Sequence, residues 1–377
     1  MSDIIQDSKR TVLAPYRICP IGAHSDHQGG PTLGMAVSAH TKLTFSPSAS
    51  SEVRLESVNF ADEVRFDLGD PAEQPGQPDL PDWGRYPRAA ALALGERVTR
   101  GIEGTVEGTL PGSGLSSSAS VLLAYLTALA DANELELTAK ETAELALRAE
   151  RDFVGVKVGI LDFAAIVGAE RDQLLFIDSR ETRWEALALG EGAPAWRILV
   201  AFTGTTRNLA ATGYNSRVDE CFEAVATLAA AAGLEAARGL HDFTDAQFDE
   251  HRTKLEGAPA RRARHFFTER ARVRRGAELW RRGHLEEFGA LMNASCESSI
   301  QNWESGSPEL IELQQILLET EGVYGSRFSG AGFGGCVVAL VDGTRDEDIR
   351  RSVEHAMNAR PPASVFLLDS DDGIRIL

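Results

Sequence analysis

The sequence predicts an α+β protein of two domains, with an antiparallel sheet near its N-terminus and long helices in its second half. It has 377 residues, and at about 100–200 residues per domain this length corresponds to two or three domains. The segments KLTFSPS (42–48) and SEVRLESV (51–58) alternate between polar and apolar residues, as strands of an antiparallel sheet do. Apolar residues recur at helical spacing over 116–132 and in several stretches after residue 215.

The first part of the chain is predicted to alternate strands, loops and helices. Serines open the first helix and are good N-caps, and Thr138 with Glu141 forms a capping box that opens the second. In chain order, these elements are a strand over 11–21, an irregular proline-rich stretch over 68–84, helices over 116–132 and 138–153, and a short strand over 174–178.

The pattern changes near residue 180, so we expect an N-terminal domain over 1–180 and a C-terminal domain over 181–377. The apolar run WRILVAFTG (196–204) is predicted to be the strand that opens the second domain. The remaining predicted elements are helices over 216–237, 246–256, 260–282 and 284–299, followed by a loop and strand over 323–342.

The net charge of −18 argues against a surface that binds nucleic acid or an anionic membrane. The nine arginines of 261–282 are predicted to form a solvated helix face. Four cysteines without a CxxC pair, an acidic N-terminus and the lack of an 18-residue apolar run favour a reduced, cytoplasmic protein without a transmembrane helix.

The segment LPGSGLSSSAS (110–120) is the most informative one. Its glycines allow a close approach of the backbone to a ligand, and its serines lie where a predicted helix begins. Free N–H groups at such a helix start bind anions, which predicts a phosphate site. An ordinary serine-capped helix after a glycine-rich turn is the alternative. No Gly-Lys pair and no Asp-Phe-Gly occurs, which excludes a Walker A loop and the protein-kinase signature.

A second glycine segment, GAGFGG (330–335), has the G-x-G-x-x-G spacing of a dinucleotide-binding loop. That motif must follow a strand and open a helix, whereas here the glycines run into the strand-like CVVALV. We therefore predict no Rossmann fold.

Three segments carry a resemblance: YRICPIGAHSDHQGG (16–30), PGSGLSSSAS (111–120) and FSGAGFGGC (328–336). In this order they resemble the GHMP small-molecule kinases, the family of galactokinase, homoserine kinase, mevalonate kinase and phosphomevalonate kinase. The similarity covers roughly residues 12–342, and the run 14–30 is most similar to galacturonokinases. The resemblance implies an N-terminal mixed sheet with a left-handed β-α-β unit, a C-terminal α/β sandwich domain, and an active site in the cleft between them.

The resemblance also implies ATP, Mg²⁺ and a set of catalytic residues. Asp162 falls where galactokinases carry the catalytic base, and Arg17 where an arginine stabilises the transferring phosphoryl group. Glu150 falls on the metal-binding glutamate, and Ser117 or Ser118 would add a hydroxyl ligand. On the residues alone, a solvent-facing or capping acid is favoured for Asp162 and an exposed helix acid for Glu150. The implied ATP-phosphate loop consists of Gly112, Ser113, Gly114, Leu115, Ser116, Ser117 and Ser118.

Sugar contacts are implied for His24, Asp26, Gly159 and Tyr214. His24-x-x-His27 around Asp26 could also suggest a metal site, although no third ligand is evident. Tyr214 could otherwise be a core tyrosine.

One departure from the family pattern concerns the substrate. Galactokinases usually have a glutamate for the sugar 6-hydroxyl at the position of Ala23. Its loss removes an acceptor and a negative charge that would repel a C6 carboxylate. Arg207 is our hypothesis for the cation that binds this carboxylate, with His27 and Arg85 as weaker candidates.

The expected function is therefore ATP-dependent 1-phosphorylation of D-galacturonate. Galactokinase and glucuronokinase are the alternatives within the class, and a non-catalytic sugar and ATP sensor is the alternative outside it. The expected partners are a small-molecule uronic acid and ATP, without nucleic acid or membrane. A second departure, Phe163 in place of a family glutamine, leaves the surroundings of the base open.

Overall fold

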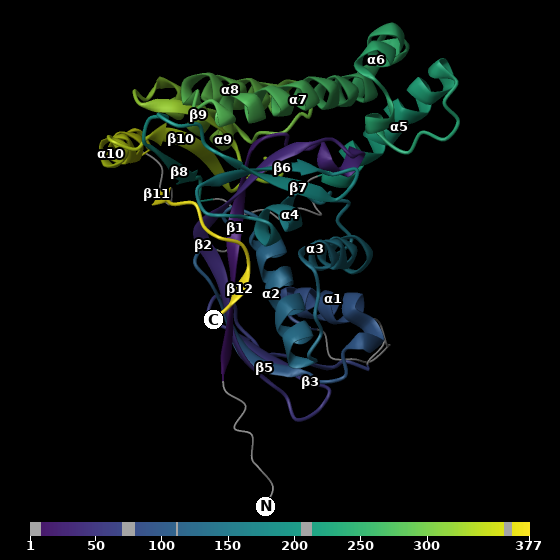
Figure 1. Cartoon of the computed structure of the whole chain (residues 1–377), viewed down its shortest axis with the longest axis vertical. Helices are drawn as coiled ribbons and strands as arrows, with labels where there is room; N and C mark the ends of the chain where they lie inside the picture. Colours follow the sequence, from purple (N-terminus) through teal and green to yellow (C-terminus); the bar gives the residue numbers. More distant parts are fainter. Residues whose placement is uncertain (1–8, 70–79, 111, 205–212, 358–363) are drawn as a thin grey trace, which may run out of the picture.

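The computed structural model describes residues 9–69, 80–110, 112–204, 213–357 and 364–377 (Figure 1). Within these residues the strands form an eight-stranded sheet and a four-stranded sheet. The eight-stranded sheet carries helices α1 to α4 on one face, and helices α7 to α10 pack on the four-stranded sheet, while α5 and α6 lie at the end of α7 (Figure 1). The α+β class predicted from the sequence is confirmed.

The larger sheet is mixed, with the order β12-β1-β2-β5-β3-β4, while β6 pairs with β2 and β7 with β6. Only the β3–β5 pair is parallel among the strand pairs described, and the connection between those two strands includes α1. The hand of that connection stays a prediction. The strands are β1 (Arg10–Ile21), β2 (Thr32–Pro47), β3 (Glu52–Ser57), β4 (Val64–Asp67), β5 (Ile102–Gly108), β6 (Gln173–Asp178), β7 (Arg183–Ala188) and β12 (Arg375–Ile376).

Alternation along the strands directs one side of this sheet into a core with the helices. Leu43 and Phe45 of β2 are buried against α2, whose Leu122, Leu126 and Leu129 are fully buried. Because α2 lies among the sheet, α1 and α3, it is apolar on most of its surface. The helices are α1 (Arg85–Leu94), α2 (Ser117–Ala132), α3 (Ala139–Arg148) and α4 (Leu161–Val167).

The smaller sheet has the antiparallel order β11-β8-β10-β9 and is buried on both faces. Ile198 and Val200 of β8 pack in one core with Trp280 of α7, whereas Leu199 and Ala201 pack in another with α9 and α10. The strands are β8 (Trp196–Phe202), β9 (Val323–Phe328), β10 (Cys336–Asp342) and β11 (Ser364–Leu368). The helices are α5 (Tyr214–Ala232), α6 (Asp245–His251), α7 (Gly257–Arg281), α8 (Leu285–Gln301), α9 (Pro308–Glu319) and α10 (Asp346–Met357).

Most predicted elements occur, and three corrections follow. The capping box is confirmed, since the Thr138 hydroxyl accepts from the Glu141 amide and the Thr138 amide donates to Glu141. The helix that it opens ends at Arg148, however, and continues as a π-helical turn, Ala149–Val154. Helices α1, α4, α9 and α10 were not predicted.

The third correction concerns the arginine-rich helix α7, which is not simply a solvated face. Arg262 and Arg270 are buried, at 2% and 7% exposure, and form ion pairs with Glu220, Glu304 and Asp245. Buried arginines persist where carboxylates compensate them, so these two hold α7 to its neighbours.

The expected boundary at residue 180 lies between β6 and β7, which are paired strands of the larger sheet. The division of the chain at that residue stays a prediction. No helix in the described part of the chain is long and apolar enough to cross a membrane.

Candidate active site

A cavity of about 690 Å³ lies where the ends of β1 and β9 meet the first turns of α2, α4 and α5. Both glycine segments and the loop after β1 contribute to its wall. The structure therefore brings together side chains from five distant parts of the sequence. The predicted site residues that line the cavity are Arg17, Ala23, His24, Asp26, Gly112, Gly114, Ser116, Ser117, Ser118, Glu150, Gly159, Asp162 and Tyr214.

The predicted phosphate loop is held by its backbone. Gly112 and Gly114 adopt left-handed φ angles of 74° and 86°, which glycine tolerates without strain. Gly114 packs directly on the second glycine segment. The contact is so close that a Cβ on Gly335 would lie 2.9 Å from the Gly114 Cα. Buried Leu115 accepts a hydrogen bond of 3.2 Å from the Arg17 amide of β1. The loop is thus fixed between the two glycine segments and β1.

The free start of α2 opens on this cavity. Ser117 and Ser118 are its first residues, and the Ser117 hydroxyl accepts from the Gly112 amide at 3.2 Å. Ser113 is buried and does not line the cavity. The second glycine segment continues into β10, as the sequence predicts, and not into a helix.

Asp162, at the start of α4, is held at both carboxylate oxygens. The Arg17 Nε donates to Oδ1 at 2.7 Å, and the Ser116 hydroxyl donates to Oδ2 at 2.6 Å. Burial opposes the charge of Arg17, but its ion pair with Asp162 raises its pKa. A second contact, from Arg17 Nη1 to the Ser329 hydroxyl at 3.4 Å, orients the guanidinium. A carboxylate held in this way is oriented to accept a proton from a hydroxyl in the cavity.

Ser116 departs from the predicted N-cap role. Its φ is 57°, in the left-handed region, and its side chain caps no amide of α2. A non-glycine residue in this region costs about 1–2 kcal/mol. The strained backbone instead directs the Ser116 hydroxyl to Asp162. The sequence could not show this contact, because a serine at the start of a helix ordinarily predicts an N-cap.

Glu150 lies in the π-helical turn, 4% exposed, with Oε2 lacking a hydrogen-bond partner. Burial, with a smaller contribution from the Asp162 charge, raises its pKa to about 7, and Arg85 opposes the shift. An unpartnered buried carboxylate oxygen at a cavity is costly unless a cation binds it. The residues therefore fit a hard divalent cation, held by this carboxylate, a hydroxyl of α2 and phosphate oxygens.

Asp26 and Gly159 are in direct contact on the opposite wall. A Cβ on Gly159 would lie 2.2 Å from the Asp26 carboxylate, so only glycine fits there. The Asp26 Oδ2 accepts from the Leu161 amide at 3.1 Å. Burial, with the charge of Asp162, raises the pKa of Asp26 to about 6.

An aromatic cluster holds His24. Its ring stacks on Trp303 at 4.8 Å with an interplanar angle of 4°, and Tyr214 lies 6.3 Å away. Burial lowers the pKa of His24 well below its usual value, so the ring is a neutral hydrogen-bonding group. Sequence reasoning missed Trp303, which is distant in the chain and belongs to no motif.

Ala23 borders the cavity, and its carbonyl accepts from His265 Nε2 at 2.9 Å. His265 and its neighbours on α7 were likewise missed. Of the candidates for a carboxylate partner, Arg207 lies outside the described residues, His27 is buried but does not line the cavity, and Arg85 lines it near Glu150. In the described chain no three His, Cys, Asp or Glu side chains gather as a metal site, so the His-x-x-His reading gains no third ligand.

Phe163, the second departure from the family pattern, is 1% exposed, packs in the core of the larger sheet and also borders the cavity. Asp162 thus has an apolar chain neighbour, with Arg17 and Ser116 as its polar partners.

Comparison with known proteins agrees with this geometry. Residues 85–169 match the GHMP kinases N terminal domain and residues 277–359 the GHMP kinases C terminal. The chain is 39% identical to a galacturonokinase of Arabidopsis thaliana, over 98% of this chain and 93% of that protein. It is 35% identical to a galactokinase of Enterococcus faecalis, over 87% of this chain and 84% of that protein.

Among solved structures, Lactococcus lactis galactokinase complexed with galactose superimposes with a TM-score of 0.88 at 28% identity, covering 98% of this chain and 95% of that one. The Methanococcus jannaschii mevalonate kinase has the same fold, with a TM-score of 0.67 at 19% identity and coverage of 97% of this chain and 100% of the other. The protein therefore belongs to the GHMP kinase family, and within it to the sugar kinases that include galactokinase and galacturonokinase.

Proposed function

We propose that the protein transfers the γ-phosphoryl group of ATP to the C1 hydroxyl of D-galacturonate, giving galacturonate 1-phosphate and ADP. The observation that carries this proposal is Ala23, a methyl group on the cavity wall beside His24. An acid at this position would repel a C6 carboxylate in a partly desolvated pocket, whereas alanine leaves room for it. The 39% identity to a galacturonokinase supports the same substrate.

In this reaction, Asp162 orients the C1 hydroxyl and accepts its proton as the oxygen attacks the γ-phosphorus. Arg17, held 2.7 Å from Asp162, orients the carboxylate and places positive charge beside the transferring phosphoryl group. His24, Asp26, Gly159 and Tyr214 would surround the sugar.

The nucleotide phosphates would lie along 112–118, at the amide-rich start of α2. A bound Mg²⁺ would neutralise charge on the phosphate oxygens. Glu150 would hold it through the carboxylate oxygen that has no other partner, together with the hydroxyl of Ser117 or Ser118. We also place the protein in the cytoplasm, which its four free, buried cysteines support.

An ADP-release assay with MgATP tests the proposal on galacturonate, glucuronate and galactose, with Asp162→Asn alongside. Turnover is expected to be highest on galacturonate and lost in the variant. Highest turnover on galactose or glucuronate would assign the protein to the corresponding kinase and overturn the substrate argument from Ala23. Nucleotide and sugar binding without turnover would favour a sensor.

A further inference from the structure

The charged side chains on the cavity wall are mostly acidic. Among the described residues that line the cavity, the basic side chains are Arg17 and Arg85, and the acids are Asp26, Asp82, Glu150 and Asp162. Arg17 is already committed to Asp162 through an ion pair of 2.7 Å. The predicted phosphate loop, 112–118, contains no basic residue, although the nucleotide that we propose for it is a polyanion. Arg85 is thus the lining arginine whose charge the proposed mechanism does not use.

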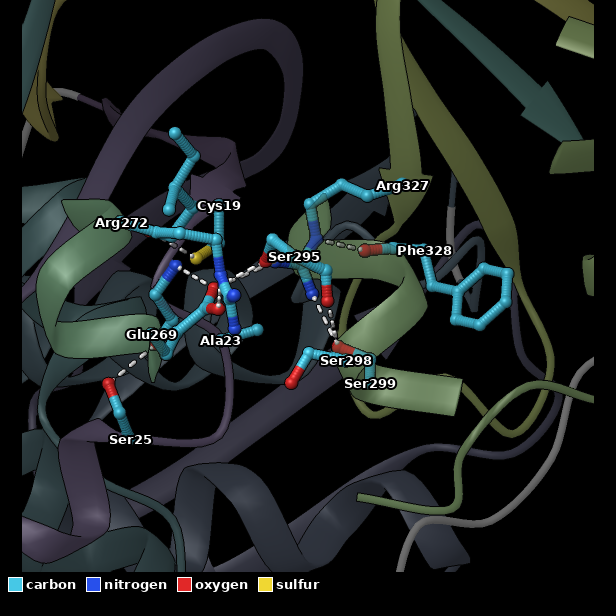
Figure 2. Close-up of polar contacts among 12 residues, drawn as sticks. Cys19, Ala23, Ser25, Glu269, Arg272, Ser295, Ser298, Ser299, Arg327 and Phe328 are labelled. Atoms are coloured by element: carbon cyan, nitrogen blue, oxygen red, sulfur yellow. Dashed lines mark hydrogen bonds and ion pairs between the residues drawn. The ribbon is translucent and has the colours of Figure 1, made fainter. Parts of the chain in front are cut away.

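The buried arginines behind the Ala23 turn are paired within the protein (Figure 2). Glu269 of α7 accepts from Arg272 Nε at 2.6 Å and lies 3.7 Å from Arg327 of β9. The same carboxylate accepts from the Gly22 amide at 2.7 Å. Neither of these arginines borders the cavity, so this cluster holds the turn in place and is not available to a ligand.

Arg85 is the first residue of α1, which packs on α2 and on the π-helical turn that carries Glu150. The Arg85 side chain is exposed and borders the cavity. Its guanidinium lies 5.2 Å from the centre of the Tyr86 ring, which borders the cavity as well. In the described part of the chain, no carboxylate forms an ion pair with Arg85, including that of Asp82, three residues before it. The guanidinium can therefore turn towards a ligand without breaking an ion pair of the described residues.

The electrostatic neighbours of Arg85 place it on the proposed nucleotide side of the cavity. Burial raises the pKa of Glu150 to about 7, and the cation that opposes this rise is Arg85. On the sugar side, burial and the Asp162 charge raise the pKa of Asp26, and there the opposing cation is Arg151. The charge of Arg85 thus acts at the carboxylate proposed to hold Mg²⁺, where phosphate oxygens would share the metal.

We infer that Arg85 binds phosphate oxygens of the nucleotide. This inference rests on the proposed function, in which ATP is the phosphoryl donor. A guanidinium presents parallel N–H donors that match two oxygens of a phosphate group. From α1, Arg85 supplies the positive charge that a Walker A loop carries on its own lysine. This role differs from the sugar carboxylate contact for which the sequence made Arg85 a weaker candidate.

Equilibrium binding of ADP, followed by calorimetry in EDTA, tests the inference without sugar and without turnover. No divalent cation then shares the phosphates, so the measurement reports protein groups alone. Arg85→Gln removes the charge but keeps a polar side chain, and it is expected to raise the Kd for ADP roughly tenfold or more. Arg85→Lys keeps the charge and should stay within about threefold of the parent. An unchanged Kd in Arg85→Gln would overturn the inference.

The matched control is Arg97→Gln. Arg97 follows α1, is exposed and does not border the cavity, so this variant should bind ADP as the parent does. Equal losses in Arg97→Gln and Arg85→Gln would assign the effect to the net charge of the protein and would overturn a direct contact. Because Arg85 is exposed, its variants should melt at the same temperature as the parent.

Steady-state kinetics distinguishes the phosphates from the sugar carboxylate as the partner of Arg85. In Arg85→Gln, the KM for ATP should rise roughly tenfold, while the KM for galacturonate stays the same. A rise in the KM for galacturonate with an unchanged KM for ATP would place Arg85 at the sugar and overturn the inference.

These outcomes also separate failure of the inference from failure of the proposed function. If the parent and Arg85→Gln bind ADP equally, Arg85 is not a phosphate ligand, while the proposed function stands. If the parent binds no ADP, with or without Mg²⁺, the proposed phosphoryl donor is wrong and the inference falls with it. A parent that prefers galactose would refute the proposed sugar and leave the ADP comparison unaffected.

Discussion

The two sides of the cavity differ in what forms them: backbone on one side and side chains on the other. The proposed nucleotide side is built mainly from backbone, because Gly114 packs on Gly335 of the second glycine segment and the start of α2 faces the cavity. The proposed sugar side depends on side chains that are far apart in the sequence, including His24, His265 and Trp303. A substitution of a side chain on the sugar side is therefore transmitted to partners hundreds of residues away, whereas the nucleotide side is sensitive mainly at its glycines.

Asp162 joins the two sides, and its replacement should have the largest effect. Asp162→Asn keeps the size of the side chain but loses the proton acceptor, so kcat is expected to fall about 10²–10⁴-fold. Nucleotide binding should persist, because the backbone of the phosphate loop is unchanged. Asp178→Asn, at the end of β6, is the matched control. A fall of less than tenfold would remove Asp162 as the base.

Glu150 tests the nucleotide side with a stability readout. Because its pKa in the folded protein is about 7, above the usual 4.5, its contribution to stability falls as the pH rises from about 4.5 to 7. Glu150→Gln removes that loss and should be more stable than the parent at pH 8, by roughly 1–3 kcal/mol, and similar to it near pH 4.

The same Glu150→Gln variant should need more Mg²⁺ and lose roughly 10–100-fold in activity at limiting Mg²⁺. Glu144→Gln, on the exposed face of α3, serves as the control. A pH-independent difference in stability together with an unchanged Mg²⁺ requirement would contradict the role proposed for Glu150.

Trp303 tests the sugar side. Trp303→Leu removes the ring on which His24 stacks, and we expect the KM for the sugar to rise roughly tenfold while the KM for ATP stays the same. Trp196→Leu is a useful comparison, because Trp196 packs on Trp280 away from the cavity and should affect stability alone. Equal rises in the KM for the sugar and the KM for ATP would contradict the prediction, because they would show that Trp303 affects both sides of the cavity.

Ser116 gives the smallest expected effect and lies at the junction of the two sides. Ser116→Ala and Ser116→Gly both remove the hydroxyl that binds Asp162, so each should lower kcat by roughly tenfold. Only glycine relieves the left-handed φ of 57°, so the glycine variant should be more stable than the alanine variant, by about 1 kcal/mol. Similar kcat values in both variants and the parent would exclude a role for this hydroxyl.

The same contrast explains what the sequence could predict. The glycine-rich turn before α2, the second glycine segment and the capping box at Thr138 depend on local residues, and the structure has each of these elements where the motif indicates. Phosphate binding by the turn stays a prediction. Ser116 was predicted as a helix cap from its residue type. Its left-handed backbone depends on packing with distant residues, which the sequence does not show.

Long-range contacts account for the remaining differences. Arg262 and Arg270 are buried because carboxylates on other elements pair with them. The sequence does not show these partners, so the arginines of α7 were predicted to be solvated. Arg327 lies beside the recognised glycine segment, yet its pairing with Glu269 of α7 and Ser295 of α8 becomes visible only in the structure.

One pairing in the larger sheet bears on how the protein is made. Strand β1, which ends in the active site beside Arg17, pairs along its outer edge with β12, where Val12 faces Ile376 and Leu13 faces Arg375. During translation, that edge stays open until nearly the whole chain has left the ribosome. An open strand edge can pair with other chains. The stretch of β1 at Val12 and Leu13 is therefore open to pairing with other chains until β12 has been synthesised.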